Sequence, residues 1–172
     1  MPGFSTNHNP DPDLVTLPVA TNRTDLVSNE IDEEGNLEGE NLEVMIATGG
    51  NTETQFITSW DWSNKGQLWW FGGQPGDSLL LRFKVPETGK YSVTLRLTMA
   101  SDYGITSYFI NNIPVTRFNG YTEGEKVTEI TVDDFLLPGG ENILTMVIQG
   151  KQKEAKDGYM AGIDRISINP SK

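Results

Sequence analysis

Two runs of alternating apolar and polar residues constrain this chain more than any other feature. Leu79 to Val85 alternates in this way, and so does Tyr91 to Met99. A period of two over such lengths predicts β-strands that are buried on one face. Pro86-Glu87-Thr88-Gly89 lies between the runs and combines a proline that fixes φ with a glycine that accepts positive φ, which predicts a hairpin turn. We therefore expect two antiparallel core strands joined by a tight hairpin.

Shorter runs of the same kind fill most of the remaining sequence. They are separated by turn residues, and no segment has a convincing amphipathic helical pattern. The runs lie at residues 37–47, 56–57, 107–110, 115–118, 127–137, 143–148 and 159–169. Roughly eight to ten short strands at regular spacing predict an all-β protein with an antiparallel β-sandwich or jelly roll. We expect the first and last strands to lie side by side.

The domain organisation follows from a change in composition near Gly35. Residues 1–34 are rich in Pro, Asn, Asp, Thr and Ser, which predicts a flexible or loosely docked N-terminal arm or linker. Residues 35–172 carry the strand patterns and are expected to form the single β-sandwich domain.

Charge and residue usage exclude several classes of function. The formal net charge is −11, from 24 acidic and 13 basic residues, which argues against nucleic acid or an anionic membrane as partner. No apolar run is long enough to cross a membrane. The chain has no cysteine, and its one histidine is His8 in the arm. A Ser-His-Asp triad and a histidine zinc site within the domain are therefore excluded.

Three carboxylates have an unexpected position in the strand patterns. Glu38 and Glu40 share the parity of Leu42, and Asp164 shares the parity of Ile166. In regular strands these three side chains would point toward the core, where unpaired carboxylates are costly. A Ca²⁺ ion, which takes several carboxylate and carbonyl ligands, would remove that cost. The alternative is that bulges near Gly39 and Gly162 turn the side chains outward.

The order of several short motifs resembles a known family. These motifs are LEGENLEV, LWWFGGQPGDSLLLRFKVPETGKYSVTLRLT, ASDYG, FINNIPV, LLPGGENILTMVI and GIDRISI. Between about Leu37 and Asn169 they resemble the galactose-binding-like jelly rolls of carbohydrate-binding module families 6 and 35. They are also similar to the β-sandwich module appended to glycoside hydrolases of family 172. The resemblance implies a structural calcium between the first and last strands, with Glu38, Glu40 and Asp164 at the matching positions.

A sugar site requires an aromatic surface beside polar side chains, because a sugar ring has an apolar face and hydroxyl edges. Trp60, Trp62 and Asn64 provide this combination in one expected loop, and Asp102, Tyr103 and Tyr121 provide it in two others. Each aromatic side chain could instead close an end of the core. We expect Trp69 and Trp70 to pack in the core or on the sheet, since they lie within a strand pattern.

These features favour a non-catalytic carbohydrate-binding module whose partner is a polysaccharide or an oligosaccharide. One alternative is a structural or oligomerisation domain, with a second copy or a parent hydrolase as its partner. A glycoside hydrolase is the other, because 24 acidic residues offer many carboxylate pairs. The resemblance further implies a bacterial protein that is extracellular, periplasmic or on the cell surface, although the first residues show no secretory signal.

Overall fold

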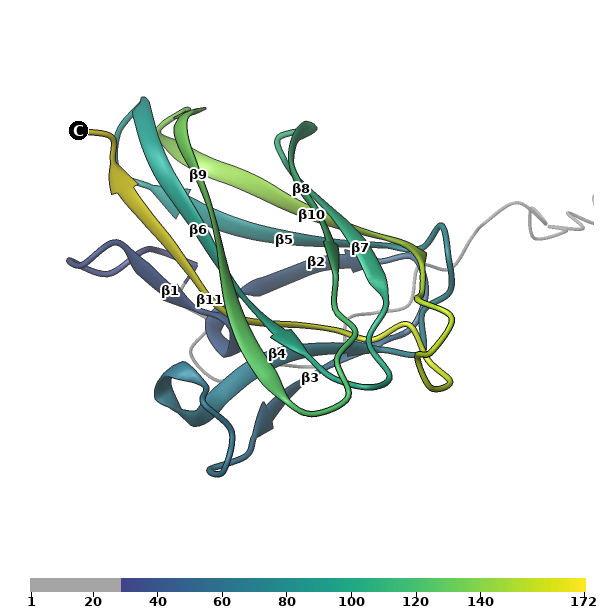
Figure 1. Ribbon diagram of the computed structural model, residues 1–172. Helices are drawn as coiled ribbons and strands as arrows, with labels where there is room; N and C mark the ends of the chain where they lie inside the picture. Colours follow the sequence, from purple (N-terminus) through teal and green to yellow (C-terminus); the bar gives the residue numbers. More distant parts are fainter. Residues whose placement is uncertain (1–28) are drawn as a thin grey trace, which may run out of the picture.

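A computed structural model describes residues 29–172 as two facing antiparallel sheets (Figure 1). One sheet has the order β3-β4-β11-β6-β9, with β1 paired to β11, and the other has the order β2-β5-β10-β7-β8. The first sheet contains β1 (Asn36–Glu38), β3 (Asn51–Phe56), β4 (Gly66–Phe71), β6 (Gly89–Met99), β9 (Lys126–Leu137) and β11 (Ala161–Pro170). The second contains β2 (Glu43–Ala47), β5 (Ser78–Val85), β7 (Ile105–Ile110), β8 (Ile113–Asn119) and β10 (Gly140–Gly150). Two single turns of 3₁₀ helix, η1 (Gly39–Asn41) and η2 (Ser63–Lys65), interrupt these strands.

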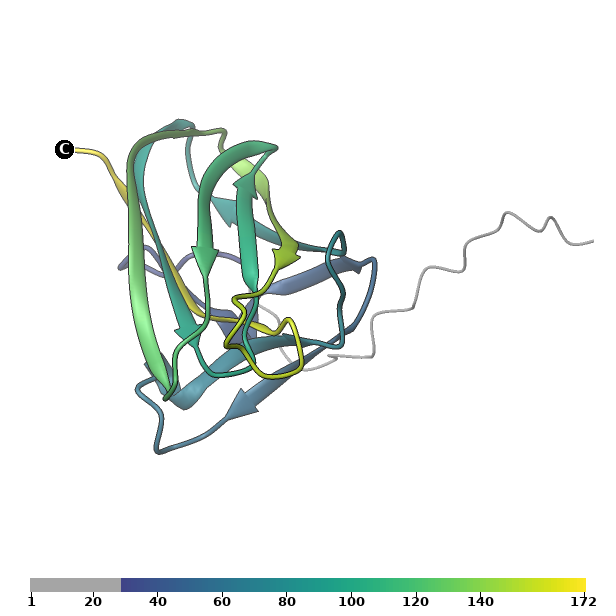
Figure 2. The same ribbon diagram turned by 45° about the vertical axis from the view of Figure 1, so that its right-hand side comes forward.

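The predicted all-β sandwich is confirmed, and its core lies between the two sheets. Alternate residues of each central strand point inward, so that β5 buries Leu79, Leu81 and Phe83 while β6 buries Val93 and Leu95. The neighbouring residues of both strands remain partly exposed on the outer faces. Figure 2 shows the two sheets as facing layers. Each strand therefore needs only one apolar face to contribute to the core between the sheets.

The two central strands are present, but the predicted hairpin between them is wrong. β5 pairs with β2 and β10, whereas β6 pairs with β11 and β9 in the other sheet. The turn after Val85 therefore crosses from one sheet to the other. Alternation fixes which face of a strand is buried and does not identify its hydrogen-bonding partner. The connection at Asn111-Asn112 is a true hairpin between β7 and β8, with both residues at positive φ.

The first and last strands lie side by side, as the sequence predicts. Asn36, Leu37 and Glu38 of β1 pair with Ser167, Ile166 and Arg165 of β11. Farther along the same edge of β11, Ala161 to Ile163 pair with β4. β6 occupies the opposite edge of β11. β11 therefore joins three strands and holds the middle of its sheet together.

Glu40 and Asp164 are buried, as the parity argument predicts, but irregular backbone and not regular strand alternation places them. The η1 turn separates β1 from β2 and resets the alternation, so that Leu37 enters the core and Glu38 does not. In β11 the pairing with β6 shifts between Ile163 and Arg165, which makes Asp164 the extra residue of a bulge. Asp164 contacts Arg96, which lies on the outer face of β6 between buried Leu95 and Leu97.

Connecting segments gather at one end of the sandwich. The loop after β6, the loop after β8 and the segment between β10 and β11 exchange backbone hydrogen bonds there. Ala100 N donates to Gly120 O at 3.0 Å, and Lys156 N donates to Ser101 O at 2.8 Å. No helix within residues 29–172 is long and apolar enough to cross a membrane.

Candidate functional site

A hollow of about 230 Å³ lies beside the gathered loops, on the outer side of the β3-β4 edge. Trp69 of β4 and Trp60 of the loop after β3 provide its aromatic surface. Asp102 comes from the loop after β6, and Gln55 comes from β3. The remaining lining residues are Ile57, Ala100, Ser101, Tyr103, Glu125 and Met160. Four chain segments thus bring half-buried indole rings next to a carboxylate and an amide.

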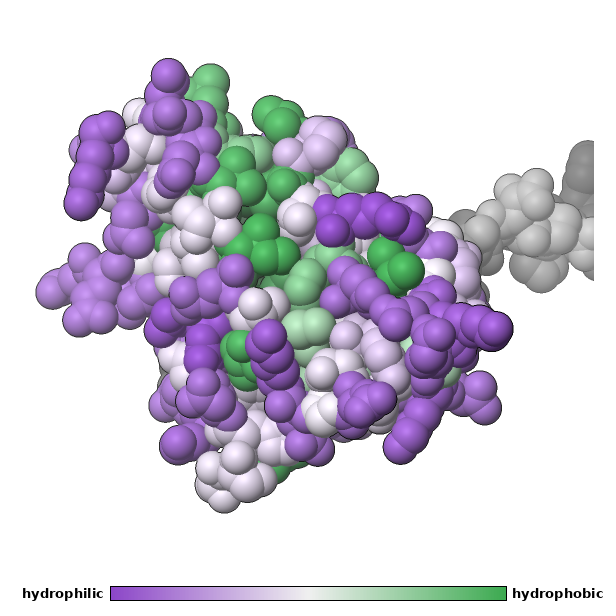
Figure 3. All heavy atoms as spheres, viewed as in Figure 1, coloured by the Kyte–Doolittle hydropathy of each residue, from purple (hydrophilic) through white to green (hydrophobic). Residues whose placement is uncertain are grey.

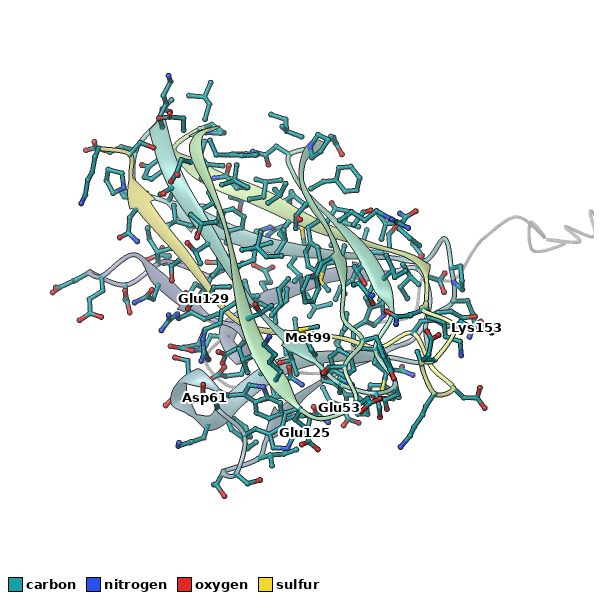
Figure 4. All side chains as sticks on the ribbon, in the orientation of Figure 1. Glu53, Asp61, Met99, Glu125, Glu129 and Lys153 are labelled. Carbon is teal, nitrogen blue, oxygen red and sulfur yellow. The ribbon has the colours of Figure 1, made fainter. Side chains whose placement is uncertain are left out.

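The two tryptophans of the hollow are held by neighbouring aromatic rings. Trp69 stacks on Phe71 with ring centroids 4.2 Å apart, and both rings lie on the outer face of β4. Trp60 packs against Trp62 at 4.7 Å, with the rings tilted by 47°. These contacts restrict the ring orientations before any ligand arrives, which lowers the entropic cost of binding. In Figure 4, Glu53 of β3, opposite Trp69 in the β3–β4 register, and Glu125 lie at this end of the molecule.

A chain of buried polar side chains fixes the floor beneath the hollow. Trp62 Nε1 donates to Thr98 Oγ1 at 2.9 Å, and Thr98 Oγ1 donates to Gln67 Oε1 at 2.6 Å. Gln67 Nε2 donates to Tyr103 OH at 3.0 Å and to Gln55 Oε1 at 2.7 Å. Gln67 is completely buried, and burial raises the pKa of Tyr103 above its usual range, so its hydroxyl stays protonated.

The structure separates the six expected sugar-binding residues into groups. Trp60, Asp102 and Tyr103 line the hollow, although only 4% of Tyr103 is exposed. Trp62 is 3% exposed and supports Trp60 from below. Trp62, Asn64 and Tyr121 do not line the hollow. Asn64 donates to Glu40 Oε1 at 2.9 Å, and Tyr121 lies in a bridge to Ala100.

Trp69 lines the hollow but was not among the expected sugar-binding residues. Both tryptophans of β4 were expected to pack in the core or on the sheet, and Trp70 does so at 1% exposure. Trp69 points to the opposite face of the strand and remains half-buried. The signal was available in the alternation, because Leu68 and Trp70 form the buried face of β4 and leave Trp69 outside.

A charged cluster lies farther along the same outer face. Arg96 donates to Asp164, and its guanidinium lies 3.2 Å from Asp61 and 3.5 Å from Glu129. Arg165 lies 3.6 Å from Glu129. Figure 4 shows Asp61 on the loop after β3 and Glu129 on β9, approaching from opposite directions. A hollow of about 290 Å³ between them is lined by these side chains.

The expected calcium ligands lie at the border of this cluster. Ser63 N donates to Asp164 Oδ1 at 2.8 Å, and Ser63 Oγ donates to Glu38 Oε1 at 2.9 Å. Burial raises the pKa of Asp164 from 3.8 to about 6, against the lowering effect of Arg96 and the Ser63 N–H. Glu38, which is nearby, raises the Asp164 pKa further.

The side chains of these residues are of the type that binds a metal ion, but they are not arranged around one. The Oε2 atom of Glu38 is buried and accepts no hydrogen bond, which is costly for a carboxylate and suits a hard cation. However, no three acidic, histidine or cysteine side chains within residues 29–172 are arranged so that they could hold a metal ion. Carboxylate oxygens are ligands that calcium prefers, but these carboxylates do not surround a single position.

Comparison with solved structures places this architecture among known folds. The chain superimposes on part of a Paenibacillus xanthan lyase with a TM-score of 0.69 and 19% identity, covering 79% of this chain and 13% of the lyase. A family 35 carbohydrate-binding module from an environmental isolate matches with a TM-score of 0.51 and 15% identity, covering 78% of this chain and 91% of the module. A family 35 module from Clostridium thermocellum gives 0.50 and 20%, with coverages of 78% and 97%.

The chain has the fold of a family 35 carbohydrate-binding module. The expected jelly-roll β-sandwich is therefore confirmed. No protein-family model matches the sequence, and the comparison with curated proteins finds no match. Relative to the carbohydrate-binding modules the chain is of similar length, whereas it spans only 13% of the xanthan lyase. At these identities the likeness concerns the fold.

Proposed function

We propose that this protein is a non-catalytic carbohydrate-binding module that holds a sugar in the hollow between Trp60, Trp69 and Asp102. The observation that carries the proposal is the convergence of two restrained indole rings with a carboxylate and an amide in one open hollow. An indole ring can contact the apolar face of a sugar, and Asp102 and Gln55 can bind its hydroxyl groups. The carbohydrate-binding-module fold supports this role.

The size of the hollow suggests how much sugar it holds. Its volume of about 230 Å³ is below the roughly 300–1,000 Å³ of most pockets for drug-sized ligands. We therefore expect one sugar unit or a chain end to occupy it, with an affinity on the order of micromolar to millimolar. Such binding would serve glycan capture outside the cell, in the periplasm or at the cell surface.

Binding to a panel of polysaccharides, followed by titration calorimetry with the best oligosaccharide, tests this proposal. Trp69→Ala and Trp60→Ala should each weaken binding about tenfold or more, because each removes a stacking surface. Phe56→Ala is the matched control, since Phe56 is a 65% exposed aromatic residue of β3 that does not line the hollow. The proposal fails if Phe56→Ala weakens binding as much as the tryptophan variants, or if the chain hydrolyses the sugar.

A structural calcium is the second part of the proposal. Glu38, Glu40 and Asp164 would hold it, which requires their side chains to move together from their present positions. The ion would satisfy the buried Oε2 atom of Glu38, which accepts no hydrogen bond. Calcium at about 100 times its Kd would raise the free energy of unfolding by about 2.7 kcal/mol. We expect calcium to raise the Tm of the wild type and to leave that of Glu38→Gln unchanged. Identical melting curves with calcium and with chelator, and no metal by elemental analysis, would refute this part.

An oligomerisation domain is the competing function, and the surface offers one observation in its favour. Figure 3 shows apolar residues gathered in a band over the region of β8 and β9, bordered by polar side chains. Ile113 of β8 is 51% exposed, and Leu136 of β9 is 61% exposed. Light scattering across a concentration series would distinguish the two functions. A dimer that Ile113→Ser and Leu136→Ser dissociate, without any sugar binding, would favour oligomerisation.

A further inference from the structure

A hollow of about 590 Å³ lies at the pole of the sandwich opposite the sugar site. Its walls come from residues 30–35, from the turn between β5 and β6, and from the end of β11. Tyr91 belongs to this hollow, whereas Ala100, just beyond the other end of β6, belongs to the hollow of Trp69. Nine residue steps separate Tyr91 from Ala100, and nine steps span about 30 Å in an extended strand. The two hollows are therefore separate sites.

The inner wall of this hollow is apolar. Val85, Tyr91 and Ile168 are buried core residues whose edges line it, and Ile31 packs against the same core from the segment before β1. Tyr91 does not offer its hydroxyl to a ligand, because this group donates to Glu87 O at 2.6 Å. The wall thus provides a surface for an aliphatic chain and few polar groups.

The rim of the hollow is acidic. Four carboxylates and one ammonium group line it: Glu30, Asp32, Glu33, Glu87 and Lys84. Lys84 is 4.0 Å from Glu30, and Asp32 accepts the backbone N–H groups of Glu34 and Asn36. Within residues 29–172, Glu33 and Glu87 make no ion pair. Two free carboxylates therefore remain at the edge of an apolar wall.

We propose that this hollow is a second binding site, which takes an aliphatic ammonium ion. The apolar wall accommodates the hydrocarbon part, and Glu33 and Glu87 attract the charged end. An anionic ligand would be repelled by the rim. A neutral apolar ligand would gain nothing from the two unpaired carboxylates. The site is independent of the sugar site, because it shares no lining residue with it.

Cadaverine, a linear five-carbon diamine, is a suitable probe, and pentanediol of the same length is its neutral control. We expect cadaverine to shift the NMR signals of Tyr91 and Ile168 in a saturable manner, and the diol to shift them much less. Glu33→Gln and Glu87→Gln should each weaken cadaverine binding roughly two- to fivefold, as expected for partly exposed charge pairs. Both side chains are exposed, so these variants should fold like the wild type.

Glu123→Gln is the matched control variant, because it removes an exposed carboxylate from the loop after β8 at the opposite pole. It should leave cadaverine binding unchanged. If Glu123→Gln weakened cadaverine binding as much as the other two variants, cadaverine would be attracted by the overall negative charge of the protein, and the proposal would be overturned. Equal binding of the diol, or signal shifts confined to other parts of the domain, would overturn it as well.

Discussion

At the scale of single residues, Gln67 does most to shape the candidate sugar site. It is completely buried and connects Thr98, Tyr103 and Gln55 through its side-chain amide. Gly162 of β11, which pairs with Trp69, lies beside this amide, and a Cβ added there would lie 2.0 Å from Gln67 Oε1. The glycine therefore leaves the space that this amide requires. A buried amide is tolerated here because its oxygen and its nitrogen are both hydrogen-bonded.

Gln67→Leu should destabilise the domain and loosen the floor of the hollow. The substitution leaves the hydroxyl groups of Thr98 and Tyr103 without this buried partner, which we expect to lower the free energy of unfolding by about 2–4 kcal/mol. Chemical denaturation would measure the loss. Gln149→Leu, at an exposed position of β10, is the control and should have little effect. Similar losses in the free energy of unfolding for the two variants would show that the hydrogen bonds of the Gln67 side chain contribute no stability.

The contrast between Trp62 and Trp69 shows what the sequence could predict about single residues. Strand alternation was sufficient to place Trp69 on the outer face, because Leu68 and Trp70 define the buried face. Trp62 lies in a loop, where no periodicity applies, and its burial depends on Thr98 from a distant strand. Loop residues of this kind are placed by tertiary contacts, so local pattern alone does not assign them.

At the scale of elements, the η1 turn sets the position of the acidic side chains. The chain must pass close to β11 at this point, and Gly39 allows the approach. A Cβ added at Gly39 would lie 1.8 Å from Ile163 O and 3.0 Å from Asp164 O. Both are backbone atoms of the bulged strand, so they cannot move away as a flexible side chain would. The turn and the bulge therefore depend on each other.

Gly39→Ala should destabilise the domain by about 2 kcal/mol or more, because η1 or β11 has to shift to admit the methyl group. Thermal melting would detect the change. Gly124→Ala is the matched control, since an added Cβ at Gly124 meets nothing within 4 Å. An unchanged Tm for Gly39→Ala would show that the contact with β11 relaxes easily.

Elements were predicted from the sequence more accurately than their pairing. The strands at residues 79–85 and 91–99 are present almost as expected, since each has a long apolar stripe. Two features escaped the pattern: the crossing between sheets after Val85 and the short irregularities around Glu38 and Asp164. Turns and bulges change the face of a strand within one or two residues, so parity arguments fail there.

At the scale of the whole molecule, the two proposed sites lie at opposite poles of one sandwich and share no lining residue. Binding at one should therefore leave the affinity at the other unchanged, because coupling requires an element with two arrangements. Titration of the oligosaccharide in saturating cadaverine would measure this. We expect the same Kd as in its absence. A severalfold change in Kd would indicate that the two ends of the sandwich are coupled.

The position of β11 has a consequence for the order in which the fold is assembled. β11 lies between β4 and β6 and also pairs with β1, although it is the last of the described strands to leave the ribosome. Before that moment β3 and β4 can form a hairpin, and β6 can pair with β9, but nothing joins these two halves. Pairing across such sequence separations is slow. The nascent chain should therefore remain dependent on protection from aggregation until residues 161–170 are available to close the sheet.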